Sequence, residues 1–117
     1  MPKISVIIPT INEANNLPLL LSDLSNLHKE GEIVIVDCGS DDKTIDIASI
    51  YGAKIYKSKE RNRGLQLEMG AKNSKSEWLI FLHADTRLIH DCSTKIKYKF
   101  LDKKIDIDTI IDIENIK

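Results

Sequence analysis

Short runs of β-branched and other apolar residues alternate along this chain with longer segments in which apolar residues recur every three or four positions. A short β-branched run suits a buried parallel strand, whereas spacings of three and four are typical of a helix with one apolar face. The runs predict four strands, at residues 3–9, 32–36, 53–56 and 77–82. The alternation of strands and helices predicts an α/β fold with a mainly parallel sheet and right-handed crossovers.

Three helices are predicted between these strands. The first has Asn15 or Asn16 as its cap, tolerates Pro18 in its first turn and carries leucines along one face. These leucines are Leu17, Leu20, Leu21, Leu24 and Leu27. The second helix is expected to end near Gly52, and the third to span residues 65–73. We expect each helix to pack on the sheet through its apolar face.

The pattern changes near the end of the chain and divides it into a core, residues 1–88, and a divergent C-terminal tail, residues 89–117. Asp91 or Ser93 is a cap for a short predicted helix at the start of the tail. Residues 103–117 are rich in lysine, isoleucine and aspartate and carry no turn signal. They have three interpretations: an edge strand, a disordered end, or altered sequence in place of a further half of the protein.

At 117 residues the chain can enclose one hydrophobic core. Its 17 basic and 18 acidic residues give a formal net charge of −1, so it lacks the basic excess of a general nucleic-acid binder. Cys38 and Cys92 have no Cys-x-x-Cys spacing and the N-terminus has no signal-peptide pattern, which predicts a cytoplasmic protein. Because no apolar run reaches the roughly 20 residues of a membrane span, any membrane association is expected to be peripheral, at the inner face.

Polar motifs follow three of the predicted strands, and another precedes the third helix. They read Ile-Pro-Thr-Ile-Asn-Glu at 8–13, Val-Asp-Cys-Gly-Ser-Asp-Asp-Lys-Thr at 36–44, Arg-Asn-Arg-Gly at 61–64 and Phe-Leu-His-Ala-Asp-Thr at 81–86. The carboxyl ends of parallel strands meet at one edge of a sheet, where open α/β folds bind their ligands. We therefore expect these side chains to gather at that edge.

In this order the motifs resemble the nucleotide-binding half of the family 2 glycosyltransferases, in particular the small bacterial members whose metal motif reads His-Ala-Asp. The resemblance covers residues 3–88 and implies the GT-A fold, a Rossmann-like three-layer sandwich with helices on both faces of the sheet. The acceptor-binding half of that fold is expected to be missing, so the resemblance predicts a sheet that is incomplete at its C-terminal side. In the family that half supplies the catalytic base, which is therefore assigned to no residue of this chain.

The resemblance implies that Asp85 binds a divalent metal, Mg²⁺ or Mn²⁺, together with the diphosphate and water. Carboxylate oxygens are ligands that both cations prefer. His83 stands where the family commonly has the first aspartate of Asp-x-Asp. It has three alternative roles: a contact to the ribose, a metal bond through a ring nitrogen, which favours manganese, or a structural end to the strand. The alternative for Asp85 is a turn cap.

The same resemblance places the nucleotide at the ends of the first two strands. Asp37 is implied to accept a hydrogen bond from the base, typically from a pyrimidine N–H. Pro9, Thr10 and Glu13 are implied to form the opposing wall, with Glu13 near the ribose hydroxyls. The alternative for Glu13, and for Asn12 beside it, is an ordinary helix start.

Two further segments combine capping residues with ligand candidates. Ser40 and Asp42 lie in a turn that suits the start of the second helix, and we assign Ser40 to the cap and Asp42 to the neighbourhood of the ligand. Arg63 and Gly64 resemble the Arg-Gly segment of the family, in which the guanidinium holds the base or diphosphate and the glycine permits close approach. The alternative for Arg63 is an exposed side chain without a ligand.

These assignments predict a glycosyltransferase that binds a nucleotide-diphosphate sugar through a divalent metal and transfers the sugar with inversion. The acceptor is unknown and is a saccharide, a lipid or a small molecule. One alternative is a shortened relative that binds nucleotide and metal without transfer. Another is a nucleotidyltransferase, which normally has a glycine- and lysine-rich phosphate loop where this chain has Pro-Thr-Ile-Asn-Glu. The apolar sheet edge at residues 77–82 also predicts a homodimer or poor solubility, unless the tail covers that edge.

Overall fold

The computed structural model of this chain describes residues 3–25 and 31–87. The four strands and the three helices predicted between them are present, with ends that shift by a residue or two, except that the first helix ends at Asp23, before Leu24 and Leu27 of its predicted apolar face. In chain order they are β1 (Ile4–Thr10), α1 (Leu17–Asp23), β2 (Gly31–Asp37), α2 (Thr44–Ile50), β3 (Lys54–Lys57), α3 (Arg63–Lys72) and β4 (Trp78–Phe81). Leu27 and the predicted tail lie outside the described residues, so the division at residue 88 stays a prediction.

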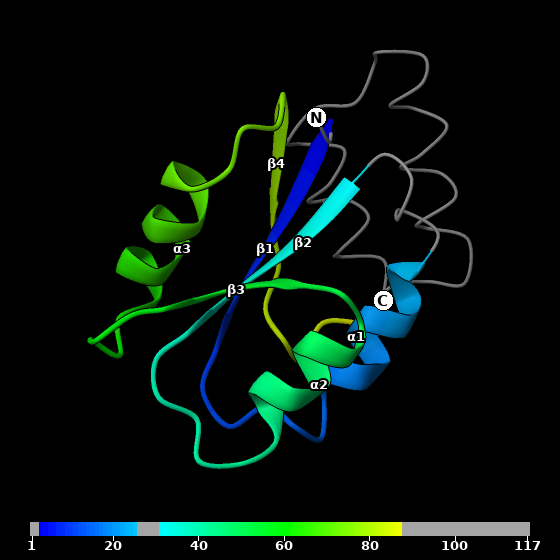
Figure 1. The fold of residues 1–117 in the computed structure, drawn as a ribbon, viewed down its shortest axis with the longest axis vertical. Helices are drawn as coiled ribbons and strands as arrows, with labels where there is room; N and C mark the ends of the chain where they lie inside the picture. The colour runs from blue at the N-terminus through cyan, green and yellow to red at the C-terminus, as the bar shows by residue number, and fades with distance from the viewer. Residues whose placement is uncertain (1–2, 26–30, 88–117) are drawn as a thin grey trace.

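The four strands form one sheet in the order β3-β2-β1-β4, and every neighbouring pair is parallel. Figure 1 shows β1 between β2 and β4. Ile4 lies opposite Gly31 on β2 and opposite Trp78 on β4, and all residues of β1 are buried. The predicted parallel sheet is therefore confirmed, with the first strand at its centre.

Helices cover both faces of this sheet (Figure 1). Val6 and Ile8 belong to a core cluster that also contains leucines of α1 and Ala48 of α2. Ile7, between them, points to the opposite face, where Leu67 and Met69 of α3 pack against it. This alternation explains why β1 reads as a continuous apolar run, and it confirms the predicted three-layer α/β sandwich. Among the described residues, no helix has the length and apolar character of a membrane span.

α3 approaches the sheet closely at Gly70, which is buried. A Cβ atom at this position would overlap Cγ2 of Ile7 and would lie 3.2 Å from Cγ2 of Val36. Glycine normally weakens a helix interior by about 1 kcal/mol relative to alanine. Here the missing side chain instead allows α3 to lie directly on β1 and β2, close to the carboxyl ends of those strands.

Gly70→Ala is expected to lower the free energy of unfolding by about 1–3 kcal/mol, since overpacking outweighs the gain in helix propensity. Urea denaturation measures the difference. Ile7→Ala removes the overlapping methyl group, so the double variant should lose less than the sum of the two single losses. An unfolding free energy that Gly70→Ala leaves unchanged would show that α3 can shift away from β1 without cost.

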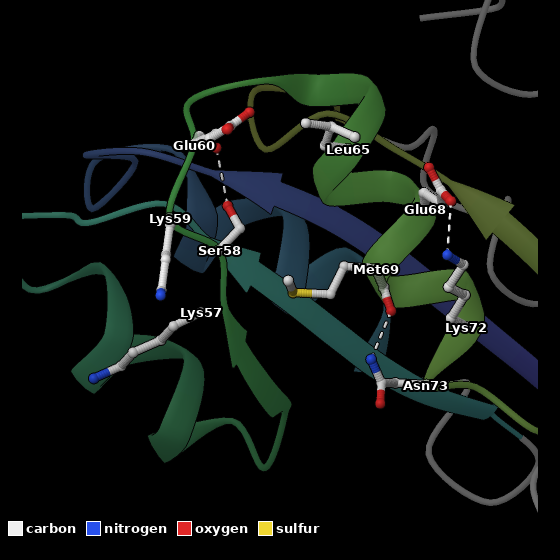
Figure 2. Close-up of a pocket in the computed structure, with 9 residues that line it drawn as sticks. All are labelled: Lys57, Ser58, Lys59, Glu60, Leu65, Glu68, Met69, Lys72 and Asn73. Carbon is white, nitrogen blue, oxygen red and sulfur yellow. Dashed lines mark hydrogen bonds and ion pairs between the residues drawn. The ribbon is translucent and has the colours of Figure 1, made fainter.

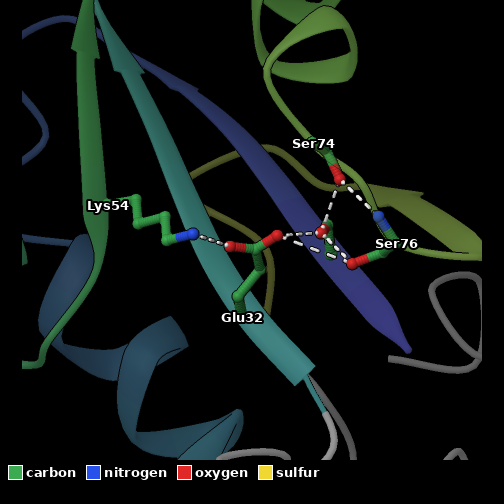
Figure 3. A network of polar contacts seen from close by, with 5 residues as sticks. Glu32, Lys54, Ser74 and Ser76 are labelled. Carbon is green, nitrogen blue, oxygen red and sulfur yellow. Dashed lines mark hydrogen bonds and ion pairs between the residues drawn. The ribbon is translucent and has the colours of Figure 1, made fainter. Parts of the chain in front are cut away.

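A polar network at the opposite end of the sheet from the predicted ligand site is centred on Glu32 (Figure 3). Its carboxylate accepts a hydrogen bond of 2.6 Å from Ser5 Oγ and forms an ion pair of 2.9 Å with Lys54 Nζ. Ser76 Oγ donates to it at 3.5 Å, and Ser74 Oγ donates to Ser5 Oγ at 2.6 Å. Burial opposes ionisation of Glu32, but the bonds from Ser5 and Lys54 outweigh it and lower the pKa. The network thus connects the amino ends of β1, β2 and β3 with the segment that leads into β4.

Candidate functional site

β1 and β2 end side by side, and a buried carboxylate joins their ends. Asp37, the last residue of β2, has an exposed fraction of 0%. Its Oδ1 accepts hydrogen bonds from Thr10 Oγ1, at 2.7 Å, and from Ser40 Oγ. Its Oδ2 accepts from the backbone N–H groups of Gly39, at 2.9 Å, and Ser40, at 2.8 Å. Both oxygens are therefore engaged by the protein.

These hydrogen bonds also decide the charge of Asp37. Burial disfavours the carboxylate and acts to raise its pKa, but the bonds from Ser40, Thr10 and Gly39 together act more strongly and lower it. Asp37 is therefore an anion at neutral pH that orders the loop after β2. Contact between Asp37 and a nucleotide base stays a prediction, because its acceptor positions are filled in this structure.

Asn12, in the loop after β1, forms hydrogen bonds to the loop after β2. This residue has φ 52°, in the left-handed region that asparagine tolerates better than most residues. Its Oδ1 accepts from the N–H of Asp41 at 2.8 Å and of Asp42 at 3.3 Å, and its own N–H donates to Ser40 Oγ at 2.8 Å. Asn12 is therefore more than a helix start, since it connects residues about 30 positions apart.

Asp42, rather than Ser40, bonds the start of α2, from the position before the N-cap residue Lys43, whose own side chain makes no capping hydrogen bond. Asp42 Oδ1 accepts from the backbone N–H of Thr44, the first residue of α2, at 2.9 Å, and Oδ2 accepts from Ala14 N–H at 3.1 Å. The hydrogen bond from the Thr44 hydroxyl is the main reason why the pKa of Asp42 is lowered. The expectation that Ser40 is the cap was wrong, because Ser40 Oγ donates to Asp37. The ligand contact predicted for Asp42 stays a prediction.

A pocket of about 210 Å³ opens at this carboxyl edge, between the end of β1 and the start of α3. The loop after β1 supplies one wall and α3 with its preceding residues supplies the other. The lining residues are Pro9, Thr10, Ile11, Glu13, Arg61, Arg63 and Gln66. The structure thus brings together four of the residues that were predicted to bind the nucleotide, namely Pro9, Thr10, Glu13 and Arg63.

The arginines of this pocket are available to an anionic ligand. Arg61 and Arg63 are exposed, and within residues 3–25 and 31–87 neither guanidinium takes part in an ion pair. Asn62 between them caps α3 by accepting a hydrogen bond from Leu65 N–H at 3.1 Å. A Cβ at Gly64 would lie 3.3 Å from Asn62 Oδ1, so glycine leaves room for the cap. The start of α3 therefore presents two unpaired cations and the positive end of a helix dipole to the pocket.

His83 and Asp85 follow β4, which lies next to β1 at the same edge of the sheet. Asp85 is exposed, and its carboxylate makes no hydrogen bond or ion pair in the part of the chain that the structure describes. Nδ1 of His83 is buried and has no hydrogen-bond partner there. The described residues include no group of three or more His, Cys, Asp or Glu side chains placed to hold a metal ion. A free carboxylate and an unpartnered ring nitrogen fit a cation whose other ligands come from a diphosphate and water.

The family model described as "Glycosyl transferase family 2" matches residues 5–115 of this chain. The chain belongs to this family. It is 39% identical over 92 residues to the 4,4'-diaponeurosporenoate glycosyltransferase of Staphylococcus haemolyticus, an alignment that covers 73% of this chain and 24% of the relative. It is 35% identical over 94 residues to the PGL/p-HBAD biosynthesis glycosyltransferase of Mycobacterium bovis, with coverage of 74% and 37%. This family 2 chain thus spans about a quarter to over a third of these curated relatives.

Solved structures confirm the GT-A fold of this family 2 chain. The crystal structure of S. aureus TarS 1-349 has a TM-score of 0.75 and 26% identity, and the match covers 86% of this chain and 32% of TarS. The complex of the same TarS fragment with UDP has a TM-score of 0.72 and 27% identity, with the same coverage. A further match is glucosyl-3-phosphoglycerate synthase from Mycobacterium tuberculosis, in a complex with Mn²⁺, UDP and glucosyl-3-phosphoglycerate. It has a TM-score of 0.65 and 23% identity, and the match covers 76% of this chain and 35% of the synthase. At this identity the likeness shows the fold alone.

A second pocket of this family 2 chain, of about 510 Å³, lies beside β3 on the outer side of α3 (Figure 2). It contains none of the predicted site residues. Its lining residues are Lys57, Ser58, Lys59, Glu60, Leu65, Glu68, Met69, Lys72 and Asn73. Glu68 and Lys72 pair with each other at 2.8 Å, and Asn73 Nδ2 donates to the Met69 carbonyl at 2.8 Å. Because the smaller pocket contains four of the residues that were predicted to bind the nucleotide and this one contains none, the smaller pocket is the stronger candidate for the nucleotide.

Sequence reasoning missed Gln66 in the smaller pocket. This residue of α3 has an exposed fraction of 4% and contacts the ends of both β1 and β2. The available signal was its spacing, because Gln66 stands three residues after Arg63 and four before Gly70, on the face of α3 that packs on the sheet. A polar residue on the buried face of a helix next to a ligand motif is a candidate for function.

Proposed function

We propose that this chain is the donor-binding part of a glycosyltransferase that uses a UDP-sugar. The observation that carries the proposal is the pocket at the carboxyl edge, in which Pro9, Thr10 and Glu13 face Arg61 and Arg63. The wall formed by Pro9, Thr10 and Glu13 offers apolar and polar groups that suit a base and a ribose. The two unpaired guanidinium groups suit a diphosphate. The UDP complex of TarS, which is 27% identical to this chain over the aligned part, supports uridine as the nucleoside.

The proposed metal site is separate from the pocket and lies at the end of β4. Asp85 would hold Mg²⁺ or Mn²⁺, and His83 would join it through Nδ1. When bound, the cation would neutralise the charge of the diphosphate leaving group. At the end of β4, the Asp85 carboxylate and Nδ1 of His83 have no partner among the described residues, which is the basis for the assignment.

In the proposed reaction, this chain holds the donor while an acceptor oxygen attacks the anomeric carbon opposite the diphosphate. Arg61 and Arg63 stabilise the negative charge that grows on the diphosphate as the glycosidic bond to it breaks. Glu13 positions the ribose. The acceptor, whether saccharide, lipid or small molecule, and the base that takes its proton are assigned to no described residue.

Calorimetric titration with UDP and Mn²⁺ tests the proposal. Arg63→Ala is expected to weaken UDP binding about tenfold, because it removes a charge-assisted contact that is worth about 1.5 kcal/mol or more. Arg87→Ala is the matched control, since the Arg87 guanidinium pairs with Asp23 at 2.8 Å and lines no part of the pocket. Absence of UDP binding to the unmodified chain, with or without metal, would show that the proposal is wrong.

A further inference from the structure

The side chain of Gln66 has a fixed orientation where it lines the proposed nucleotide pocket. Its Nε2 donates hydrogen bonds of 2.8 Å to the carbonyl oxygen of Val36 and 3.3 Å to that of Thr10. A carbonyl oxygen can accept but cannot donate, so the amide nitrogen must face the two strand ends. The carboxamide cannot be turned over without placing its oxygen against two other oxygens.

This orientation leaves Oε1 as the free polar atom of Gln66. Within the described residues Oε1 makes no hydrogen bond, and it is not among the side-chain atoms that are fully buried without a partner. Gln66 lines the pocket that also contains Pro9, Thr10 and Arg63. The side chain therefore offers the pocket an acceptor that is held in place by β1 and β2.

Asp37, the carboxylate at the end of β2, is already occupied. An ionised carboxylate has about four acceptor positions. The Asp37 oxygens receive four hydrogen bonds, from Thr10 Oγ1, Ser40 Oγ and the N–H groups of Gly39 and Ser40. A ligand N–H at the inner end of the pocket would therefore meet Gln66 more readily than Asp37.

We propose that Gln66 is the residue that selects the base: its Oε1 accepts a hydrogen bond from the N3–H group of uracil. This inference rests on the proposed function, because it concerns the nucleoside of the same donor. Cytosine carries a lone pair at N3 and would direct it at the lone pairs of Oε1. Gln66 is thus a specificity-determining residue, held by two strands.

The test combines one change in the protein with one change in the ligand. The dissociation constants of UDP, N3-methyl-UDP and CDP are measured by calorimetry, with Mn²⁺, for the unmodified chain and for Gln66→Met. The unmodified chain should bind N3-methyl-UDP and CDP about tenfold more weakly than UDP, the effect of one lost hydrogen bond in a buried pocket. In Gln66→Met the three ligands should bind within about twofold of one another.

Two results would overturn the inference while the proposed function stands. One is equal binding of UDP and N3-methyl-UDP to the unmodified chain. The other is a Gln66→Met variant in which all three ligands weaken by the same factor, because this is what a purely structural role of Gln66 produces. A chain that binds no UDP would overturn the inference and the proposed function together.

Gln66→Met also removes the two donors to the Val36 and Thr10 carbonyls and can destabilise the strand ends. Gln66→Lys provides a second variant, since its ammonium group can donate to both carbonyls and has no acceptor. It should lose the discrimination between UDP and N3-methyl-UDP in the same way. Retained discrimination in a folded Gln66→Lys variant would assign base recognition to another residue, such as Asp37.

Discussion

Asp37→Ala is expected to lower the free energy of unfolding by about 3 kcal/mol and to weaken UDP binding even if the residue never touches the ligand. The substitution leaves four donors without their acceptor at the ends of β1 and β2. The Gly39–Ser40 turn then loses its anchor, and Thr10 is no longer fixed in the pocket wall. Urea denaturation and UDP calorimetry measure the two effects.

Asp41→Ala is the control, because its side chain is exposed in the same loop. It should change the unfolding free energy by less than about 0.5 kcal/mol. The pKa of Asp37 is lowered in the folded state, so its contribution is complete above the unfolded pKa of about 3.9 and is lost as the pH falls through the folded value. The stability difference between the unmodified chain and Asp37→Asn should therefore shrink below about pH 4. A difference that persists in strong acid would contradict an anionic Asp37.

Asp85→Ala is expected to abolish the part of UDP affinity that depends on metal, about a 100-fold loss at saturating Mn²⁺. The carboxylate is exposed and makes no contact with another described residue, so the unfolding free energy should stay unchanged. The measurement is UDP calorimetry with excess Mn²⁺ and then with a chelator. Without metal, the variant and the unmodified chain should bind UDP equally.

Asp46→Ala removes an exposed carboxylate from the first turn of α2, away from the pocket, and serves as the control for charge. It should keep the full effect of Mn²⁺. A metal effect that survives in Asp85→Ala would show that the cation is held elsewhere, and His83→Ala would then identify whether the ring nitrogen is the ligand.

The strands and helices could be predicted because their signals are local. β1 reads Ile-Ser-Val-Ile-Ile-Pro-Thr, and both of its faces are buried, so the β-branched run needed no knowledge of its partners. α1 was found from leucines at three- and four-residue spacing, and Leu17, Leu20 and Leu21 are its buried residues. The position of the site could be predicted because the carboxyl ends of parallel strands lie at one edge of the sheet. Pro9, Thr10, Glu13 and Arg63 do line one pocket at that edge.

The details of the site could not be predicted because they depend on pairs far apart in sequence. Ser40 has the residue type of a helix cap, but its hydroxyl donates to Asp37 and accepts from the Asn12 N–H, and Asp42 accepts from the first N–H of α2 instead. Gln66 reaches the Thr10 carbonyl across 56 positions. No local pattern predicts that the ends of β1 and β2 contact α3, although Gly70 is the residue that allows α3 to lie close to these strands.

The central position of β1 has a consequence for biosynthesis. β1 leaves the ribosome before either of its partners, and the second of them, β4, ends only at Phe81. Contacts between residues so distant in sequence form slowly, and an unpaired apolar strand is open to wrong pairing while it waits. The nascent chain therefore carries an apolar strand without its second partner until β4 has been made, which predicts dependence on chaperones during translation and a yield that falls when expression is fast.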